Sequence, residues 1–210
     1  KGLNEWNDLD KVREGWKTLH QANQKIRKLV ENMLNYSRKT RLELKPVEFR
    51  RMLEEIVESV RDQALVRKTE MISDLDPEFD HKLMLEPESI YDAFLNLVTN
   101  ALDAIPEGQA GRVLVRSRRI ADHRNFLVEV IDTGAGIPEQ FKDKIFHLFF
   151  STKGKKGTGI GLAATKKVIE DHGGTIEYES RPGQGTVFRV FLPIVRHAPS
   201  APVVPAGAPP

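Results

Sequence analysis

The chain has 210 residues, of which 40% are hydrophobic, so it can bury one full-sized core and a smaller appendage. Its 32 basic and 30 acidic residues leave a net charge of only +2, which gives no support for a nucleic-acid partner. The sequence contains no cysteine, no apolar run near the length of a membrane span and no signal-peptide pattern, so we expect a cytoplasmic location and no membrane segment.

The first predicted element is a long amphipathic helix that fades after Tyr36, and the numbering begins inside its pattern, as expected of a fragment of a longer protein. Leu9, Leu29 and Leu34 widen its apolar stripe toward the face that a helix shows inside a bundle. One helix cannot bury such a stripe, so the pattern predicts a hairpin partner, a second subunit or both. The alternative is a helix packed on its own domain. The seam of the stripe advances in alternating steps of four and three residues, with two polar interruptions: Val12, Trp16, Leu19, Asn23, Ile26, Val30, Met33 and Ser37.

Beyond this helix the pattern predicts a hinge over residues 38–46, since Pro46 disfavours helical geometry at Lys45. The later elements alternate between helices and strands without regular βαβ spacing, which favours a mixed sheet layered on helices over a doubly wound fold. From Ala198 the chain is rich in proline and alanine, so we expect disorder there, as a tail or a linker. The predicted elements are, in chain order, a helix over 47–66, strands over 70–75 and 82–85, a helix over 87–105, strands over 112–118 and 126–131, a helix over 159–172, and a strand pair over 175–179 and 186–192.

Two patterns place side-chain oxygens where they could bind a ligand. In the helix over 87–105, Asn96, Asn100 and Asp103 recur at i, i+4 and i+7 and form a polar stripe on an otherwise apolar helix. A carboxamide oxygen there can ligate Mg²⁺, although a solvated face would give the same stripe. In the turn over 132–138, the Asp132 carboxylate can accept a hydrogen bond from an exocyclic amine, and two glycines allow close approach to a flat ring. Taken alone, this could be an ordinary turn.

Two further patterns suit a phosphate group. Residues 145–153 place three phenylalanines before Lys153, which is typical of an aromatic anchor for a mobile flap with a cation that reaches phosphate, although a surface lysine is the simpler interpretation. Residues 157–162 read G-T-G-I-G-L and lead into a helix, so backbone N–H groups and the helix dipole can bind an anion. The sequence lacks G-x-x-x-x-G-K-[ST], and this spacing differs from G-x-G-x-x-G, which disfavours Walker-type and dinucleotide sites.

In this order, over about residues 27–193, the patterns resemble the sensor histidine kinases of two-component signalling, in the superfamily shared with gyrase and heat-shock chaperone ATPases. The short flap resembles the nitrogen-regulation branch. The resemblance implies an α+β fold, a two-layer α/β sandwich of the Bergerat ATP-binding type, with a partial dimerisation helix over 1–45, a catalytic domain over 46–195 and the tail over 196–210. The matching motifs are the N box over 95–101, the G1 box over 132–136, the F box over 146–153, the G2 box over 157–162 and the closing glycine–threonine turn over 183–186.

The resemblance implies ATP and Mg²⁺ as cofactors and assigns roles to the candidate residues. Asn100 would ligate Mg²⁺ with Asn96 nearby, and Asp132 would receive the adenine amine. The implied catalytic residues are Asn96, Asn100 and Lys153. The implied nucleotide-binding residues are Asn100, Asp103, Asp132, Gly134, Gly136, Ile137, Phe146, Lys153, Gly157, Thr158, Gly159, Ile160, Gly161, Leu162 and Thr186.

Asn96 discriminates between the activities of this superfamily. Its ATP hydrolases carry a glutamate four residues before the metal-binding asparagine, as the general base for water. An amide cannot take a proton from water at neutral pH, so phosphoryl transfer to an external acceptor is favoured over hydrolysis. The alternatives are an ATPase or conformational clamp of the gyrase class, an anti-sigma-type serine kinase, and an ATP-sensing interaction module that does not transfer phosphate. The helical seam and the hinge disfavour the serine kinase.

The phosphoacceptor box of the family, a histidine followed by an acidic residue and an Asn-Pro or Thr-Pro step, does not occur in this sequence. The nearest candidate, His20, lacks both the acidic neighbour and the proline, and neither His147 nor His172 is expected to accept phosphate. We therefore expect the acceptor to lie just before Lys1. The implied partners are a second copy of the chain, through a homodimer of the N-terminal helix, and the receiver domain of a response regulator.

Overall fold

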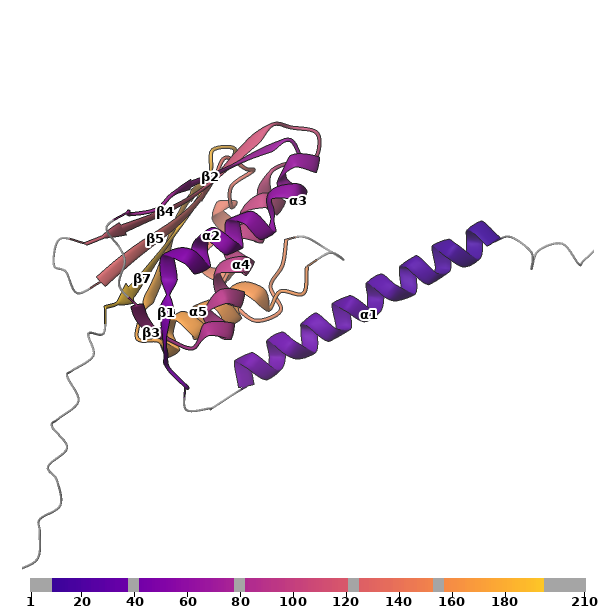
Figure 1. The fold of residues 1–210 in the computed structure, drawn as a ribbon. Coiled ribbons are helices and arrows are strands. Elements are labelled where there is room, and N and C mark those ends of the chain that lie inside the picture. Colours follow the sequence, from indigo (N-terminus) through magenta and orange to yellow (C-terminus); the bar gives the residue numbers. More distant parts are fainter. Residues whose placement is uncertain (1–8, 38–41, 78–81, 121–124, 153–156, 195–210) are drawn as a thin grey trace, which may run out of the picture.

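The computed structural model describes residues 9–37, 42–77, 82–120, 125–152 and 157–194. Figure 1 shows a twisted sheet layered against helices, with one long helix that projects away from both layers. The elements are, in chain order, α1 (Leu9–Ser37), β1 (Lys45–Glu48), α2 (Phe49–Ser59), α3 (Arg61–Val66), β2 (Thr69–Asp74), β3 (Lys82–Leu85), α4 (Pro87–Ala104), β4 (Gly111–Arg119), β5 (Asn125–Asp132), the 3₁₀ helix η1 (Glu139–Lys144), α5 (Gly161–Asp171), β6 (Thr175–Arg181) and β7 (Gly185–Pro193).

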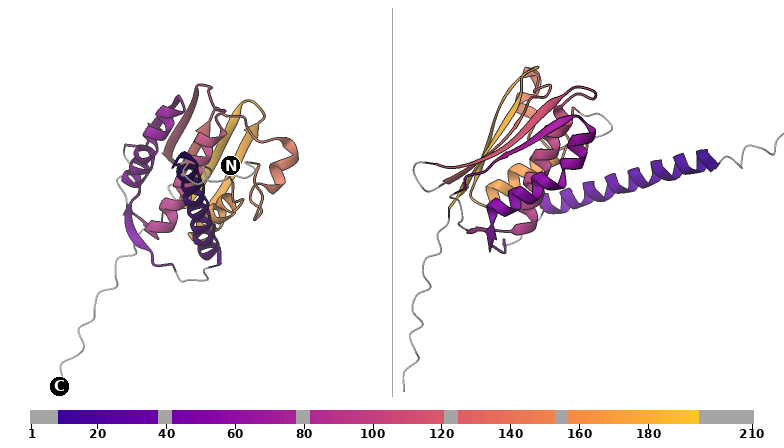
Figure 2. Two further views of the ribbon diagram at one scale, coloured as in Figure 1. Left: turned by 90° about the vertical axis from the view of Figure 1, so that its right-hand side faces the viewer. Right: turned by 45° about the horizontal axis from the view of Figure 1, so that its top comes forward.

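The main sheet has five strands in the order β2-β4-β5-β7-β6. β2 and β4 run parallel, whereas β4–β5, β5–β7 and β6–β7 are antiparallel pairs. The helices α2, α4 and α5 lie together on one face of this sheet, as the views in Figures 1 and 2 show. The mixed sheet packed on helices confirms the predicted two-layer α+β fold.

The core forms where alternate strand residues meet the apolar sides of the helices. Successive side chains of a strand point to opposite faces of the sheet. The face of β5 that meets the helices therefore carries every second residue, and its apolar members Phe126, Val128 and Val130 are buried. The ring of Phe49 in α2 lies 5.4 Å from that of Phe94 in α4 and 5.7 Å from that of Phe126, both edge to face. These contacts fix α4 over the central strand, which places the polar residues of α4 opposite the end of β5.

The predicted helix over 47–66 is wrong at its start and in its middle. Lys45–Glu48 form a strand, β1, in which Val47 pairs with Leu83 of β3 in a separate two-stranded sheet. Both of these side chains are buried, and Pro46 favours an extended chain, so the chain forms a strand here that buries the apolar pair. The helical pattern then breaks again at Val60, whose φ and ψ of −108° and 0° separate α2 from α3.

The other predicted helices and strands occur within a few residues of their expected bounds. The main shift is at α5, which begins at Gly161 rather than at Gly159, because Gly159 has a φ of +69° and so lies outside the helical region. Of the predicted hinge, residues 38–41 lie outside the described part of the chain, and residues 45–46 belong to β1. The predicted tail over 196–210 also lies outside it.

The long helix α1 carries the predicted apolar seam, and the seam side chains that the structure describes are exposed. Trp16 is 71% exposed, and Val12 and Ile26 are 63% and 62% exposed. Trp6 lies outside the described residues. Across the parts of the chain that the structure describes, no helix is both long and apolar enough to cross a membrane.

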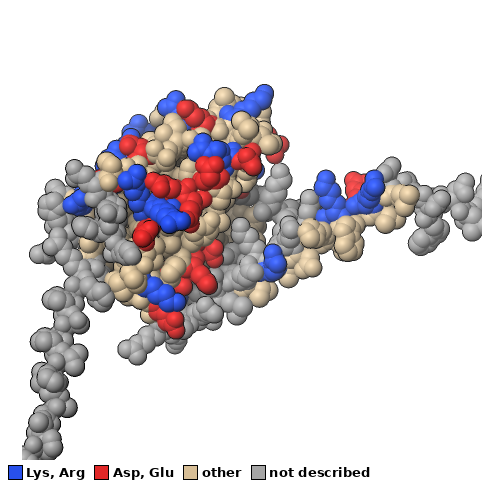
Figure 3. Space-filling view, in the orientation of Figure 1, with Lys and Arg blue, Asp and Glu red and all other residues tan. Residues whose placement is uncertain are grey.

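The surface over α2 and α3 carries side chains of both charges in alternation (Figure 3). Several of them form short-range pairs along the helices, such as Arg50 Nε with Glu54 Oε1 at 3.0 Å and Arg51 Nε with Glu55 Oε1 at 3.2 Å. This face therefore presents no field of a single sign.

Candidate functional site

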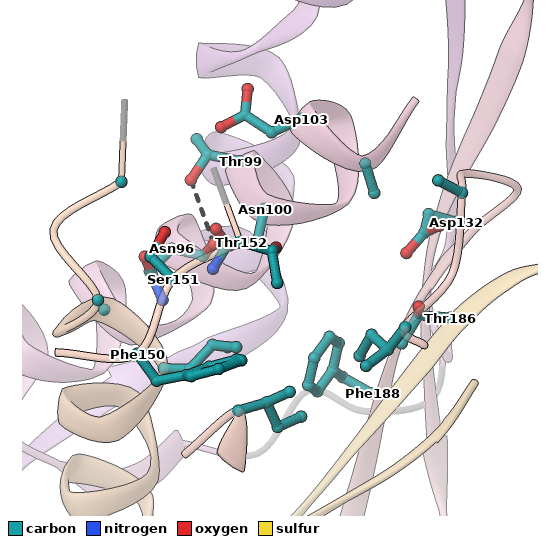
Figure 4. A pocket seen from close by; sticks show the side chains of 18 of the residues that line it. Asn96, Thr99, Asn100, Asp103, Asp132, Phe150, Ser151, Thr152, Thr186 and Phe188 are labelled. Atoms are coloured by element: carbon teal, nitrogen blue, oxygen red, sulfur yellow. Dashed lines mark hydrogen bonds between the residues drawn. The ribbon is translucent and has the colours of Figure 1, made fainter. Parts of the chain in front are cut away.

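A cavity of about 640 Å³ opens between α4, the turn after β5, the start of α5 and the strand β7. Its size lies within the range of small-molecule sites, roughly 300–1,000 Å³. Figure 4 shows Asn96 and Asn100 on α4 at one side of the cavity and Asp132 with Thr186 at the other. The sequence-predicted residues that line it are Asn96, Asn100, Asp103, Asp132, Gly136, Ile137, Gly157, Thr158, Gly159, Gly161, Leu162 and Thr186.

One end of the cavity is built around Asp132, the last residue of β5. Only 4% of this residue is exposed, and its carboxylate accepts hydrogen bonds from the backbone N–H groups of Gly134, at 2.8 Å, and of Thr186. Burial raises the pKa of the Asp132 carboxyl from 3.8 to about 6, and the two N–H groups oppose that rise. The carboxyl is therefore mostly ionised at neutral pH and can accept a further hydrogen bond from a ligand.

The turn after Asp132 is held by close backbone contacts that only glycine permits. A Cβ on Gly134 would lie 2.5 Å from the carbonyl oxygen of Ala104, and a Cβ on Gly136 would collide with the carbonyl of Arg181. Gly136 also has a φ of +69°. Hydrogen bonds from Ala135 N to Ala104 O at 2.9 Å and from Gly183 N to Ala135 O at 2.8 Å tie this turn to α4 and to the β6–β7 connection. This end of the cavity is therefore preformed.

The polar stripe of α4 forms the middle of the site. Asn96 donates from Nδ2 to Thr165 Oγ1 of α5 at 3.0 Å, which orients its carboxamide. Asp103, two turns further along, pairs through Oδ1 with Arg67 Nη2 at 2.9 Å. The carboxylate of Asp103 therefore meets a cation at the rim of the cavity, which reduces its repulsion of an anionic ligand.

The glycine-rich segment over 157–162 and the N-terminus of α5 form the other end of the site. The first-turn N–H groups of a helix carry partial positive charge, and Ile160 at the N-cap position has no side-chain oxygen to occupy them. A Cβ on Gly161 would lie 2.5 Å from Asn96 Oδ1, and a Cβ on Gly159 would collide with the backbone of Phe149. Bare backbone is thus required beside α4, which suits a phosphate chain.

The donor set fits Mg²⁺ bound together with a nucleotide. Asn96 and Asn100 offer carboxamide oxygens, and the glycines leave space beside them. Within the described residues no cluster of three or more His, Cys, Asp or Glu side chains could hold a metal. Mg²⁺ commonly binds through one or two protein groups, with phosphates and water as its other ligands.

Three of the described residues predicted from the sequence, Gly134, Phe146 and Ile160, do not line the cavity. Gly134 contributes a backbone N–H that donates to Asp132 Oδ1, and the side chain of Ile160 is buried. The ring of Phe146 packs against Tyr178 at 5.9 Å, with Lys166 Nζ 5.3 Å from its centre, so it anchors the segment from within the domain. Lys153 lies outside the described residues.

Other lining residues carried a weak signal or none in the sequence. Thr99 lies inside the quoted N-box motif and Phe150 inside the F-box motif, so both could have been chosen on position alone. Gln63 comes from α3, which no motif connects to the site. His172 is not part of the cavity: its Nε2 accepts from Glu86 N at 2.9 Å and its Nδ1 lies 2.7 Å from Val168 O, so the ring braces α5 against the start of α4.

Comparison with known proteins matches this site to a family. Residues 86–196 match the family model described as histidine kinase-, DNA gyrase B- and HSP90-like ATPase. The sensory histidine kinase/phosphatase NtrB of Azospirillum brasilense is 35% identical over 181 residues, which cover 81% of this chain and 44% of that protein. The chain spans less than half the length of the curated relatives it matches, with 36%, 27% and 44% for three of them.

Solved structures show the same arrangement of elements. The catalytic domain of the histidine kinase ThkA, in a nucleotide-free form, is 31% identical with a TM-score of 0.64, covering 73% of this chain and 99% of that domain. ThkA in complex with the response regulator protein TrrA is 26% identical with a TM-score of 0.72, covering 93% of this chain and 54% of that one.

Proposed function

We propose that this chain, which belongs to the family of histidine kinase-, DNA gyrase B- and HSP90-like ATPases, binds Mg²⁺-ATP and transfers the γ-phosphoryl group to a histidine. The premise is that the chain contains the catalytic ATP-binding domain of a sensor histidine kinase. From the histidine the phosphoryl group passes to an aspartate of a response regulator. The proposed setting is the cytoplasm, in keeping with a sequence that contains no cysteine.

The observation that carries this proposal is the position of Asn96. Its carboxamide is tied to Thr165 beside the glycine-rich segment, where a hydrolase would need a carboxylate to activate water. Among the described residues that line the cavity, the acidic ones are Asp103 and Asp132. Asp103 is paired with Arg67, and Asp132 lies at the opposite end beside Thr186. Neither is placed to act as the base, which favours transfer over hydrolysis.

The remaining residues would bind and orient the nucleotide. Asp132 would accept the exocyclic amine of adenine, and the N–H groups at the start of α5 would hold the phosphates. Asn100 would bind Mg²⁺ through its carboxamide oxygen, with Asn96 beside it. When bound, Mg²⁺ neutralises charge on the phosphates. Phosphoryl transfer asks mainly for position and charge, which this arrangement of backbone and amide groups can supply.

The acceptor is proposed to lie on a helical segment other than the catalytic domain. His172 is engaged by two backbone groups, and His147 lies in the loop after η1. The exposed seam of α1 supports a homodimer through that helix, because Trp16 and its apolar neighbours are too large a surface to leave in water. A response regulator as partner is supported by the complex of ThkA with TrrA.

The proposal is tested by incubating the chain with Mg²⁺ and ATP labelled on its γ-phosphate, alone and with a separately made helical segment of the full-length protein that bears its acceptor histidine. We expect acid-labile, base-stable label on the added segment. A chain with His20→Gln is the control and should transfer equally well.

The alternatives give different products in the same experiment. Sustained phosphate release without labelled protein would identify an ATPase or clamp. Acid-stable label on a serine would identify a serine kinase. ATP binding with neither product would identify an ATP-sensing module.

A further inference from the structure

The hydroxyl of Ser180, on β6, makes three hydrogen bonds behind the adenine end of the cavity. Its Oγ accepts from Ile137 N at 2.8 Å, donates to Gly185 O at 3.0 Å and lies 2.9 Å from Thr186 Oγ1. Ser180 and Thr186 are only 7% and 4% exposed. Ser180 is not among the residues that line the cavity, whereas Ile137 and Thr186 are.

Only one assignment of protons satisfies all three contacts. A serine hydroxyl has one proton to donate and two lone pairs that accept. The carbonyl of Gly185 can only accept, so it takes the proton of Ser180. The contact with Thr186 then requires the proton of the threonine hydroxyl, which points at Ser180. The Ser180 hydroxyl is then fully used, as expected for a buried polar group, whereas the Thr186 hydroxyl has committed only its proton.

The polarity of Thr186 toward the cavity follows from this assignment. With its proton committed to Ser180, the Thr186 hydroxyl can only accept hydrogen bonds from a ligand. Its neighbour across the β5–β7 register is Asp132, whose ionised carboxylate also only accepts. This end of the cavity therefore presents two acceptors side by side (Figure 4).

We infer that Ser180 is a positioning residue that makes the site select a 6-aminopurine over a 6-oxopurine, an inference that rests on the proposed nucleotide-binding function. Adenine offers an amine donor at C6 and an acceptor at N1, and hypoxanthine offers a carbonyl at C6 and an N–H at N1. Thr186 can accept a hydrogen bond from the amine directly, or from a water whose second O–H donates to N1. Both routes fit adenine, whereas the carbonyl at C6 of hypoxanthine has no hydrogen to donate to Thr186.

The test compares ATP with inosine triphosphate, which differs from it only at C6 and N1. Calorimetry gives the dissociation constants of both nucleotides, and the preference for ATP is the ratio of the inosine triphosphate value to the ATP value. A loss of binding that is common to both nucleotides cancels in this ratio. In Ser180→Ala the Thr186 hydroxyl is free to turn and donate to a 6-oxo group. The preference for ATP should therefore fall by about three- to tenfold, the value of one neutral hydrogen bond.

A matched control is available on the same sheet. Ser117 is 1% exposed, and its Oγ accepts from Asp76 N at 3.0 Å, away from the cavity. Ser117→Ala also removes a buried hydroxyl, and it should leave the ratio unchanged. Since Ser180 acts through Thr186, adding Ser180→Ala to Thr186→Val should not change the ratio further. An additive effect in that double variant would overturn the inference.

The remaining outcomes separate this inference from the proposed function. If Ser180→Ala weakens both nucleotides equally, Ser180 has only a structural role. If Ser180→Ala does not fold, Ser180→Cys should lower the ratio to a smaller extent, because sulfur accepts weakly, and an unchanged ratio would count against the inference. Failure of the unmodified chain to bind ATP would overturn both proposals. A lowered ratio without histidine phosphorylation would support this inference and contradict only the transfer reaction.

Discussion

Two carboxylates on strand β5 show how the two faces of the sheet differ. Glu129 points to the open face and lies 3.0 Å from Arg189 Nε and 3.8 Å from Arg116 Nη1. Asp132, three residues later, points to the helix-covered face and accepts from two backbone N–H groups. The charge of Glu129 is balanced by arginines on the neighbouring strands, whereas the buried carboxylate of Asp132 is held by uncharged N–H donors.

The difference separates structural from functional charge. A carboxylate paired with two guanidinium groups has its partners already, so it contributes to the sheet and has little left for a ligand. A buried carboxylate held by N–H groups is costly to the folded chain and retains acceptor capacity for a donor from outside. We therefore expect changes on the helix-covered face to alter nucleotide binding, and changes on the open face to alter stability alone.

The largest effect is expected for Gly136→Ala. The new Cβ would collide with the carbonyl of Arg181 in a backbone with a φ of +69°. Strain and overpacking together should cost about 2–5 kcal/mol, and ATP binding should be lost because the turn carries Ile137 into the site. Gly183→Ala is the matched control, since it has a φ of +74° with no atom within 4 Å of the new Cβ. Urea denaturation should show a loss of only about 1 kcal/mol for it. Equal losses would refute the clash.

Asp132→Asn should weaken ATP binding and, at high pH, raise the stability of the folded chain. ATP should bind about 10- to 100-fold more weakly, because a charge-assisted hydrogen bond is lost. The folded pKa of about 6 lies above the unfolded value of 3.8, so the folded chain holds more protons between these pH values, and its stability falls as pH rises through them, by at most about 3 kcal/mol. The carboxamide that Asp132→Asn introduces cannot ionise, so the variant avoids this loss of stability above pH 6. The free energy of unfolding of the variant, relative to that of the unmodified chain, should therefore be greater at pH 8 than at pH 5.

The same substitution controls for the pH dependence of binding. Protonation of Asp132 removes its charge, so ATP affinity of the unmodified chain should weaken as pH falls through about 6. The phosphates of the nucleotide titrate whichever protein binds it. The ATP affinity of Asp132→Asn should therefore change with pH only by the smaller amount that the phosphates cause. Parallel pH profiles by calorimetry would show that Asp132 does not contact the base.

Asn100→Asp tests the proposed metal ligand at the other end of the site. The added charge should weaken ATP binding about tenfold in the presence of a chelator, through repulsion of the phosphates. Excess Mg²⁺ should recover most of this loss, because the new carboxylate is a good ligand for a hard cation. Gln109→Glu adds the same charge to an exposed turn, and it should leave the ATP affinity unchanged both with the chelator and with excess Mg²⁺. An equal deficit with and without Mg²⁺ would argue against a metal at residue 100.

The smallest effects are expected on the open face. Arg189→Met removes contacts to Glu129 at 3.0 Å and to Glu179 at 3.1 Å and should cost about 1 kcal/mol, because Glu129 is only 15% exposed. Arg112→Met removes a pair with Glu70 in which both side chains are more than 60% exposed, and it should cost less than about 0.5 kcal/mol. Neither variant should change ATP affinity. A change in affinity for either would break the distinction between the faces.

Much of the site could be predicted because its signals are local. Glycines that need a positive φ or bare backbone, an aspartate at the end of an apolar strand, and amides spaced one helical turn apart are determined by neighbouring residues. Asn96, Asn100, Asp132 and residues 157–162 could therefore be chosen from the sequence. Phe146 was misplaced because the F-box motif does not say which of its aromatic rings packs inward against Tyr178 and which lines the cavity.

The sequence by itself determined the order of the elements, the mixed layered fold and the glycine-rich backbone over residues 157–162, because steric limits and hydrophobic periodicity act over a few residues. Only the tertiary structure decided the contacts between distant segments. It made Val47 a strand partner of Leu83, placed Arg67 against Asp103, and brought Ser180 to Ile137, 43 residues away. Such contacts depend on how helices and sheet pack, which no local pattern records. The end of the site that is proposed to hold adenine, from Asp132 through Thr186 to Ser180, is built from these contacts.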